Sequence, residues 1–129
     1  MPPRPGLTAT VILDVTEADT AIALGSGDVH VLATPRVVAL AEEASVKAVE
    51  GALGAGSTTV GYRVQLDHLS PTMPGTTVTA EAVLEAVEGR RLTFRVSVTD
   101  PRGLVAAGRI TRVAVERDRF MEKAAGADA

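Results

Sequence analysis

The sequence contains no cysteine, and aromatic residues are scarce: among 129 residues there are two phenylalanines, one tyrosine and no tryptophan. The lack of cysteine excludes a disulfide framework, a zinc-thiolate site and a cysteine nucleophile. Because aromatic residues are scarce, the core must be built mainly from valine, alanine, leucine and threonine. Because small domains bury only a modest fraction of their surface, we expect this chain to associate with further copies of itself.

Long apolar runs and an excess of positive charge are missing as well. No apolar run approaches the 18 residues that indicate a membrane-spanning helix, and the start MPPRPG lacks the apolar stretch of a signal peptide. We therefore expect a cytoplasmic protein without a membrane partner. The net charge of −3 argues against a nucleic-acid partner held by a basic face. Two histidines, far apart in the sequence, argue against a catalytic metal site.

The length is that of one domain, and we expect one over residues 1–129, with its core at about 7–116 and a C-terminal tail at 117–129. Runs rich in β-branched residues, separated by turn signals, predict six strands. The expected strands are residues 7–15, 20–24, 58–68, 76–87, 91–99 and 104–115. The tail is expected to form a short helix and then to fray.

One segment has the period of a long helix. Thr34 is a good N-cap residue, Pro35 suits the first turn, and Gly54 and Gly56 suit the end. At 100° per residue, the apolar stripe of this helix comprises Val38, Ala41, Ser45, Val49, Ala52 and Leu53. One apolar-striped helix beside a run of antiparallel hairpins predicts an α+β fold.

Glu42 falls within this stripe, whereas its neighbour Glu43 points to the opposite side. A carboxylate among apolar residues is costly unless it is paired with a cation or protonated. Groups of this kind gather at functional sites, so Glu42 is a candidate catalytic residue. The alternative is a small rotation of the helix that brings Glu42 to the rim of the sheet.

His68 and Thr34 are the other candidates. His68 continues the alternation of its strand and is expected to face the core together with Tyr62 and Val64. A lone histidine is more often structural, but beside a buried carboxylate it can exchange protons near neutral pH. Thr34 has an ordinary role as a helix cap, although its hydroxyl, next to free backbone N–H groups, could also hold a carbonyl oxygen or a water.

The order of elements resembles the hot-dog fold, in which an antiparallel sheet wraps around one long central helix. The stretches ATPRVVALAEEASVKAV, VQLDHLSPTMPGTTVTAEAVLEAVEGRRLTFRVSV and LVAAGRITRVAV are similar to the fluoroacetyl-CoA thioesterase-like branch of the hot-dog thioesterases. The similarity extends from about residue 15 to about residue 115. The spacing of Thr34, Glu42 and His68 agrees with the threonine, glutamate and histidine of that branch.

The resemblance implies a thioester hydrolase that acts on acyl-CoA and needs no cofactor beyond the coenzyme A of its substrate. Glu42 would attack the thioester carbonyl or activate water, His68 would assist proton transfer, and Thr34 would polarise or position the reacting group. Gly61 would bring a backbone N–H toward the acyl carbonyl. Such proteins are typically dimers with sites at the protomer interface, so we expect a homodimer.

The sequence departs from the fluoroacetyl-specific pattern ahead of the helix. Those members close the pocket with aromatic side chains, whereas ALGSGDVHVLATP contains none. We therefore expect a different or broader acyl group, of short or medium chain length. Arg90, Arg91 and Arg112 are candidate contacts for the phosphates of coenzyme A. The alternative function is a non-catalytic hot-dog module that binds acyl-CoA or another small apolar ligand; a hydratase of this fold is a third option.

Overall fold

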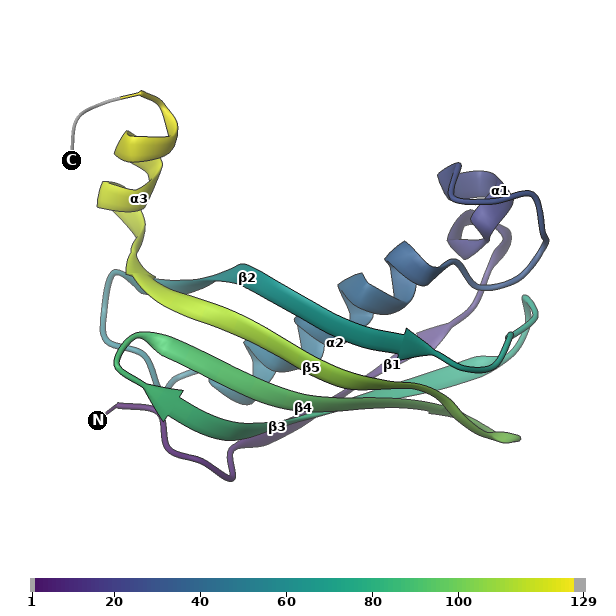
Figure 1. Cartoon of the computed structure of the whole chain (residues 1–129), viewed down its shortest axis with the longest axis horizontal. Helices are drawn as coiled ribbons and strands as arrows, with labels where there is room; N and C mark the ends of the chain where they lie inside the picture. The colour runs from purple at the N-terminus through teal and green to yellow at the C-terminus, as the bar shows by residue number, and fades with distance from the viewer. Residues whose placement is uncertain (1, 127–129) are drawn as a thin grey trace.

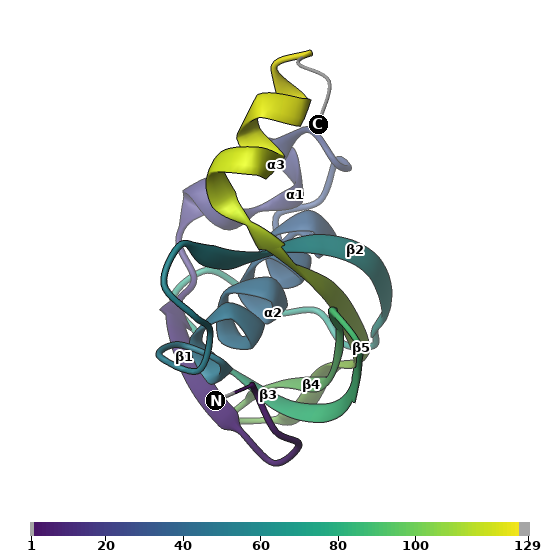
Figure 2. The same cartoon turned by 90° about the vertical axis from the view of Figure 1, so that its left-hand side faces the viewer.

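The computed structural model describes residues 2–126, which form one antiparallel sheet curled around a long helix. The elements are β1 (Thr8–Asp14), the 3-10 helix η1 (Glu17–Asp19), α1 (Ala21–Leu24), α2 (Thr34–Ala48), β2 (Ser57–His68), β3 (Thr77–Glu88), β4 (Arg91–Asp100), β5 (Gly103–Glu116) and α3 (Arg117–Ala124). The five strands are ordered β1-β3-β4-β5-β2. Figures 1 and 2 show the strands enclosing α2, which is the α+β arrangement expected from the sequence.

The core lies between α2 and the inner face of the sheet. Strands β3 and β4 alternate between buried and more exposed residues, as half-buried strands do. Many of the buried side chains are alanines, among them Ala41 and Ala44 on the helix and Ala80 and Ala82 on β3. Phe94 is fully buried, whereas Tyr62 and Phe120 are exposed. The helix can therefore lie close to the sheet because few large side chains separate them.

Five of the six expected strands are confirmed to within one residue at each end. The strand expected at residues 20–24 is wrong, because this segment forms the short helix α1. The hydroxyl oxygen of Thr20 accepts a hydrogen bond from the N–H of Ala23 at 3.2 Å and so caps α1. Gly25 then ends the helix in the left-handed conformation, with φ of 70°. The short helix expected in the tail is confirmed as α3, whereas residues 127–129 lie outside the described chain.

Helix α2 is confirmed, but its cap, its end and its buried face differ from the expectation. Ala33 rather than Thr34 is the N-cap, and the helix ends at Ala48, before the two glycines. The buried residues are Val37, Leu40, Ala41, Ala44, Ser45 and Ala48. This face is rotated by roughly 80° from the expected stripe at 100° per residue. The rotation arises because α2 packs mainly against β1 and β3 rather than against β2.

Strand β2 lies at one edge of the sheet and pairs only with β5 among the described strands. The prediction that Tyr62 and Val64 face the core is wrong, because these residues are 53% and 43% exposed. The register with β5 shifts between Gly61 and Arg63, so Tyr62 is the extra residue of a β-bulge. Residues 61–65 are all exposed, which leaves the middle of this strand uncovered. Within residues 2–126, no helix is both long and apolar enough to cross a membrane.

Candidate functional site

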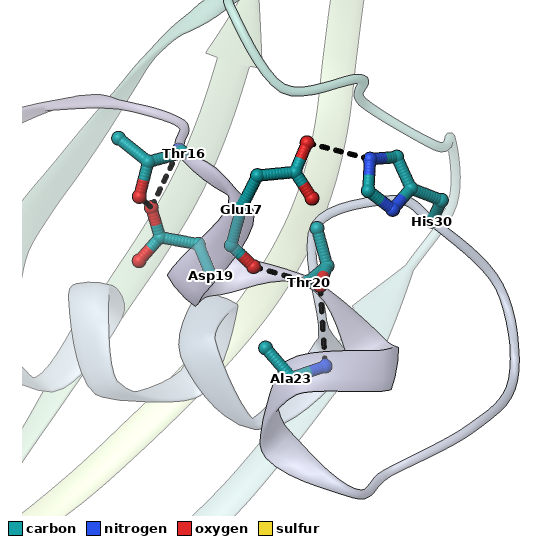
Figure 3. A network of polar contacts seen from close by, with 6 residues as sticks. All are labelled: Thr16, Glu17, Asp19, Thr20, Ala23 and His30. Atoms are coloured by element: carbon teal, nitrogen blue, oxygen red, sulfur yellow. Dashed lines mark hydrogen bonds and ion pairs between the residues drawn. The ribbon is translucent and has the colours of Figure 1, made fainter.

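Polar contacts hold the segment ahead of α2, and Figure 3 shows those among Thr16, Glu17, Asp19, Thr20, Ala23 and His30. Oδ2 of Asp19 accepts hydrogen bonds from the backbone N–H of Thr16 at 2.8 Å and from its hydroxyl at 3.2 Å. Oδ1 of Asp19 accepts a third from Nε of Arg36 at 3.0 Å. Burial of Asp19 opposes ionisation, but these hydrogen bonds outweigh it and lower the pKa of Asp19 below its usual value. Asp19 thereby joins this segment to the first turn of α2.

Backbone contacts close the loop that follows. The N–H of Ala21 donates to the carbonyl of Val31 at 2.9 Å, and that of Ala33 donates to the carbonyl of Asp19 at 2.9 Å. Nε2 of His30 lies 2.7 Å from Oε1 of Glu17 in the exposed part of the loop (Figure 3). The two ends of residues 22–30 are therefore fixed close together.

An open pocket of about 320 Å³ lies between this loop and the start of α2. The N-terminal part of its lining is Ala21, Ser26, Gly27, Asp28, Val29, Val31, Leu32 and Ala33. Thr34 and His68 line it as well, followed by Leu69, Ser70 and Pro71. None of the lining residues is phenylalanine, tyrosine or tryptophan, as the sequence ahead of the helix indicated. The pocket can therefore admit groups larger than a tightly enclosed aromatic pocket would.

Thr34 and His68 meet at the rim of this pocket. Oγ1 of Thr34 and Nδ1 of His68 are 2.8 Å apart, a hydrogen-bond distance. Because Ala33 takes the N-cap position, the hydroxyl of Thr34 is not used for capping and is available to the histidine. His68 is the last residue of β2, so the start of the helix and the end of the strand bring the two residues together.

The ring of His68 is partly withdrawn from water. Its burial lowers the pKa of His68 below the usual 6.5, and an interaction with the backbone of Ser70 opposes this shift without cancelling it. The imidazole is therefore neutral at pH 7 and has one donor and one acceptor nitrogen. Nε2 is buried and has no hydrogen-bond partner among residues 2–126. A buried polar atom of this kind needs a water, a ligand or a second chain to satisfy it.

Glu42 lies at the rim of the core rather than within it. Its side chain is 32% exposed, which corrects the burial expected from the helical stripe. Oε2 of Glu42 accepts a hydrogen bond from Nη1 of Arg112 at 2.7 Å, so the carboxylate is paired with a cation. Its other oxygen, Oε1, accepts no hydrogen bond from the described residues. One carboxylate oxygen is therefore fixed while the other is free to act on a substrate or a water.

Arg112 is the residue that fixes this carboxylate, and its own position is fixed by Thr59. Nε of Arg112 donates to Oγ1 of Thr59 and Nη2 donates to the carbonyl of Thr59, both at 2.9 Å. Burial lowers the pKa of Arg112, and the Glu42 carboxylate opposes that shift. The guanidinium remains charged at neutral pH. Since its donors are already engaged by Thr59 and Glu42, Arg112 is not the free phosphate contact considered from the sequence.

Gly61 borders the same carboxylate. A Cβ atom at this position would lie 2.6 Å from Oε2 of Glu42, closer than real Cβ contacts allow. A larger residue would shift the end of the flexible Glu42 side chain relative to Arg112. The close approach of Glu42 is thus a reason for glycine here, beside the carbonyl contact implied by the resemblance.

The candidate residues form two groups within one chain. Thr34 and His68 lie together at the N-terminus of α2, and Glu42 lies with Gly61 and Arg112 further along. Eight residues at 1.5 Å each separate Thr34 from Glu42 by about 12 Å along the helix axis. No hydrogen bond joins Glu42 to His68 among the described residues. A histidine with a hydroxyl and a carboxylate held by arginine can perform acid–base or nucleophilic chemistry, but only if the two groups act on one substrate.

The sequence reasoning missed the partnership of Arg112 with Glu42 and the part played by Thr59. One signal was available: Arg112 is two residues after Ile110 on β5, so alternation places it on the buried face of that strand. A buried arginine needs an anionic partner. Residues 2–126 contain no group of three histidine, cysteine, aspartate or glutamate side chains that could hold a metal ion.

Comparisons with known proteins give the family. Residues 15–118 match the family described as FlK, fluoroacetyl-CoA-specific thioesterase. The fluoroacetyl-CoA thioesterase of Streptantibioticus cattleyicolor is 38% identical over 94 residues, which cover 73% of this chain and 68% of that protein. The structure of the fluoroacetyl-CoA thioesterase FlK superposes with a TM-score of 0.91 at 31% identity, covering 98% of each chain.

A second solved structure is similar over nearly the whole chain. It is a hypothetical protein of Thermus thermophilus described as a thioesterase superfamily member, with a TM-score of 0.89 and 27% identity, covering 97% of this chain and 93% of that one. These similarities confirm the hot-dog fold expected from the order of elements. The chain belongs to the FlK family of fluoroacetyl-CoA-specific thioesterases, and it is a thioester hydrolase.

Proposed function

We propose that this protein hydrolyses acyl-CoA thioesters with short or medium acyl groups, and that Thr34, Glu42 and His68 are its catalytic residues. The observation that carries the proposal is the Thr34–His68 hydrogen bond of 2.8 Å at the rim of an open pocket. Oε1 of Glu42, which accepts no hydrogen bond from the described residues, is the carboxylate oxygen that acts in the reaction. The family supports the reaction type, and the geometry supports the choice of residues.

In this reaction water adds to the thioester carbonyl, the C–S bond breaks, and the products are a carboxylic acid and free coenzyme A. Glu42 either attacks the carbonyl carbon, expels the thiolate and forms a mixed anhydride that water then hydrolyses, or removes a proton from the attacking water. Neutral His68, held by Thr34, accepts a proton that the attacking water loses and then passes it to the departing thiolate. Hydrolysis in water enriched in oxygen-18 separates the two routes, because only nucleophilic attack labels the Glu42 carboxylate over repeated turnovers.

A second copy of the chain would complete the site. The two groups of candidate residues lie about 12 Å apart along α2, and Nε2 of His68 has no partner among residues 2–126. The exposed residues 61–65 of the edge strand β2 lie between them. An exposed edge is a surface that native proteins normally cover. We therefore infer a homodimer in which β2 lies at the interface and each site takes residues from both protomers.

The lining of the pocket supports a broader acyl group than fluoroacetyl. Its volume of about 320 Å³ is open to solvent on one side, and none of its lining residues is phenylalanine, tyrosine or tryptophan. Discrimination for one fluorine atom requires a tight, dry pocket. We expect kcat/KM for fluoroacetyl-CoA to exceed that for acetyl-CoA by at most about tenfold. A preference of several orders of magnitude for fluoroacetyl-CoA would contradict this part of the proposal.

The experiment that tests the proposed function is free-thiol release from a panel of acyl-CoAs. Wild type is compared with Glu42→Gln and with Glu43→Gln, the matched control on the adjacent exposed glutamate. We expect release by wild type and by Glu43→Gln, and a loss of at least a hundredfold in Glu42→Gln. If no acyl-CoA releases thiol with the folded wild type, or if both variants behave alike, the proposal fails. Sedimentation velocity of the same samples tests the homodimer.

A further inference from the structure

Tyr62, the only tyrosine of the chain, lies between two arginines on the edge strand. The guanidinium carbon of Arg91 is 4.8 Å from the centre of the Tyr62 ring, and that of Arg63 is 5.6 Å from it. Both distances are within the range of cation–π contacts. Nη2 of Arg91 also lies 3.5 Å from the hydroxyl of Tyr62. We call Tyr62, Arg63 and Arg91 the arginine–tyrosine cluster.

The β-bulge explains how these side chains come together. Gly61 is directed toward Glu42 on the inner side of the sheet, where α2 lies. Arg91 precedes buried Leu92 on β4 and is itself exposed, so it lies on the outer face. Without the bulge, Tyr62 and Arg63 would point to opposite faces. The extra residue turns both outward, beside Arg91.

The positive charge of the cluster is unpaired. Arg36, Arg95, Arg109 and Arg112 each form an ion pair with a carboxylate. Arg63, Arg91 and the adjacent Arg90 form none among the described residues. A shallow pocket of about 240 Å³, lined by Glu88, Arg90, Arg91 and Val113, adjoins the cluster. Glu88 is the one acidic residue in that lining, so the arginines outnumber it. In a chain with a net charge of −3, this is a local concentration of positive charge.

The chemistry of the cluster suits an anion with several oxygen atoms. A guanidinium that lies over an aromatic ring is oriented by the ring but keeps its in-plane N–H donors free. Two such groups present a fork geometry that matches phosphate oxygens. Arginine held in this way loses less freedom on binding than an unsupported surface arginine.

We propose that the arginine–tyrosine cluster, with Arg90 beside it, binds a phosphate group of the nucleotide portion of coenzyme A. This inference rests on the proposed function, since it assigns the part of the substrate that remains outside the acyl pocket. The cluster starts one residue after Gly61, which borders Glu42. Strand β2 carries Tyr62 and Arg63 of the cluster and, at its end, His68, which lines the acyl pocket.

Direct binding tests the site without requiring turnover. The dissociation constants of coenzyme A and of adenosine 3′,5′-bisphosphate are measured by calorimetry for wild type, for the double variant Arg63→Gln/Arg91→Gln, and for Arg4→Gln. Arg4 is an exposed arginine that precedes β1 at the opposite edge of the sheet, so it controls for the loss of one positive charge away from the cluster. We expect the double variant to bind both ligands at least about tenfold more weakly, and Arg4→Gln to match wild type. Equal affinities in all three proteins overturn the proposal.

Kinetics separate nucleotide binding from a structural role. With acyl-CoA as substrate, the double variant is expected to have a higher KM than wild type and nearly the same kcat. Acyl-pantetheine, which has no phosphate, should be hydrolysed equally by wild type and by the double variant. An equal loss on both substrates means that the cluster only supports the fold or the dimer, and overturns the proposal. A double variant that binds 4′-phosphopantetheine more weakly but adenosine 3′,5′-bisphosphate normally also overturns the proposal. The cluster would then bind the phosphopantetheine arm of a carrier protein. If coenzyme A binds through the cluster but no thioester is cleaved, the proposed function fails while the binding site stands.

Discussion

Oε2 of Glu42 lies 2.6 Å from the position that a Cβ atom of Gly61 would occupy. Glu42 is on α2 and Gly61 is on β2, which begins nine residues after α2 ends. The same oxygen accepts the hydrogen bond from Arg112 at 2.7 Å. The carboxylate is thus confined between an arginine and a glycine backbone. Changes at either neighbour should move it without removing it.

The first prediction concerns Gly61→Ala. The added methyl group displaces the Glu42 carboxylate, and a misplacement of this size is expected to lower kcat/KM by about 10- to 100-fold. The free energy of unfolding should change by less than about 1 kcal/mol, because the position is exposed. Gly54→Ala is the control, since a Cβ there meets only Oγ of Ser57 at 4.0 Å. Steady-state kinetics and urea denaturation check both variants; full activity of Gly61→Ala would contradict the placement of Glu42.

The second prediction concerns Arg112→Gln. This change leaves a partly buried carboxylate without its cation and removes two hydrogen bonds to Thr59, so we expect a loss of about 1–3 kcal/mol in unfolding free energy. The value of kcat should fall more than KM rises, because Glu42 is no longer positioned. Arg109→Gln, which breaks an exposed pair with Glu85, should cost about 0–1 kcal/mol. Similar losses in the two variants, measured in urea, would count against a special role for Arg112.

The third prediction separates the two roles of helix-start threonines. Thr34→Val removes the hydroxyl that contacts His68 and should lower kcat about a hundredfold, whereas Thr34→Ser should retain most activity. Stability should hardly change, because Ala33 is the cap of α2. Thr20→Val is the contrasting case, since it removes the cap of α1 and should cost about 1 kcal/mol. Thermal melts and kinetics together check this; a large loss of stability in Thr34→Val would mean that its hydroxyl is structural.

The fourth prediction is the pH dependence of His68. Since burial lowers its pKa below 6.5, the ring stays neutral at pH 7 and the acid limb of kcat/KM should lie below pH 6.5. The depressed pKa contributes stability above the unfolded pKa, and this contribution is lost as pH falls through the folded value. NMR titration gives the pKa directly, with the His68 signal assigned by its disappearance in His68→Gln. A folded pKa above 6.5 would be inconsistent with the buried ring.

The fifth prediction concerns Asp19→Asn in the segment ahead of α2. Hydrogen bonds from Thr16 and Arg36 lower the pKa of Asp19, so the ionised form contributes stability above the unfolded pKa, which is lost as pH falls through the lower folded pKa. At pH 7 the variant should lose about 1–2 kcal/mol. Its stability should also decline less steeply between pH 4 and pH 2. Asp67→Asn, at an exposed position of β2, is the control for both measurements.

The sequence predicts β3, β4 and β5 closely because each combines alternating β-branched residues with a tight turn at its ends. The five residues of 20–24 are too few to show a period, and their helix depends on the cap supplied by Thr20. The rotation of α2 was not predictable from the wheel alone. Val37 and Leu40 are buried because the helix lies against β1 and β3. The arrangement of the whole sheet determines which helix face is covered.

The candidate site shows the same division. The resemblance selects Thr34, Glu42 and His68, and the structure brings Thr34 and His68 together across 34 positions of sequence. The partner of Glu42 is 70 positions away, on a strand whose register no local pattern reveals. Pairing between β2 and β5 aligns Gly61 with Arg112, and this alignment decides where the carboxylate lies. Local patterns thus indicate the residue types, whereas the register of distant strands determines their contacts.

The loop of residues 22–30 is closed at its base by backbone contacts between Ala21 and Val31 and between Asp19 and Ala33. Residues of this loop form one wall of the pocket beside Thr34 and His68, but none of them belongs to the buried core. Changes in the length or side chains of this loop would therefore leave the start of α2 and the fold unaltered. Substrate preference could diverge rapidly between relatives by replacement of this wall alone, while the reacting groups are inherited unchanged.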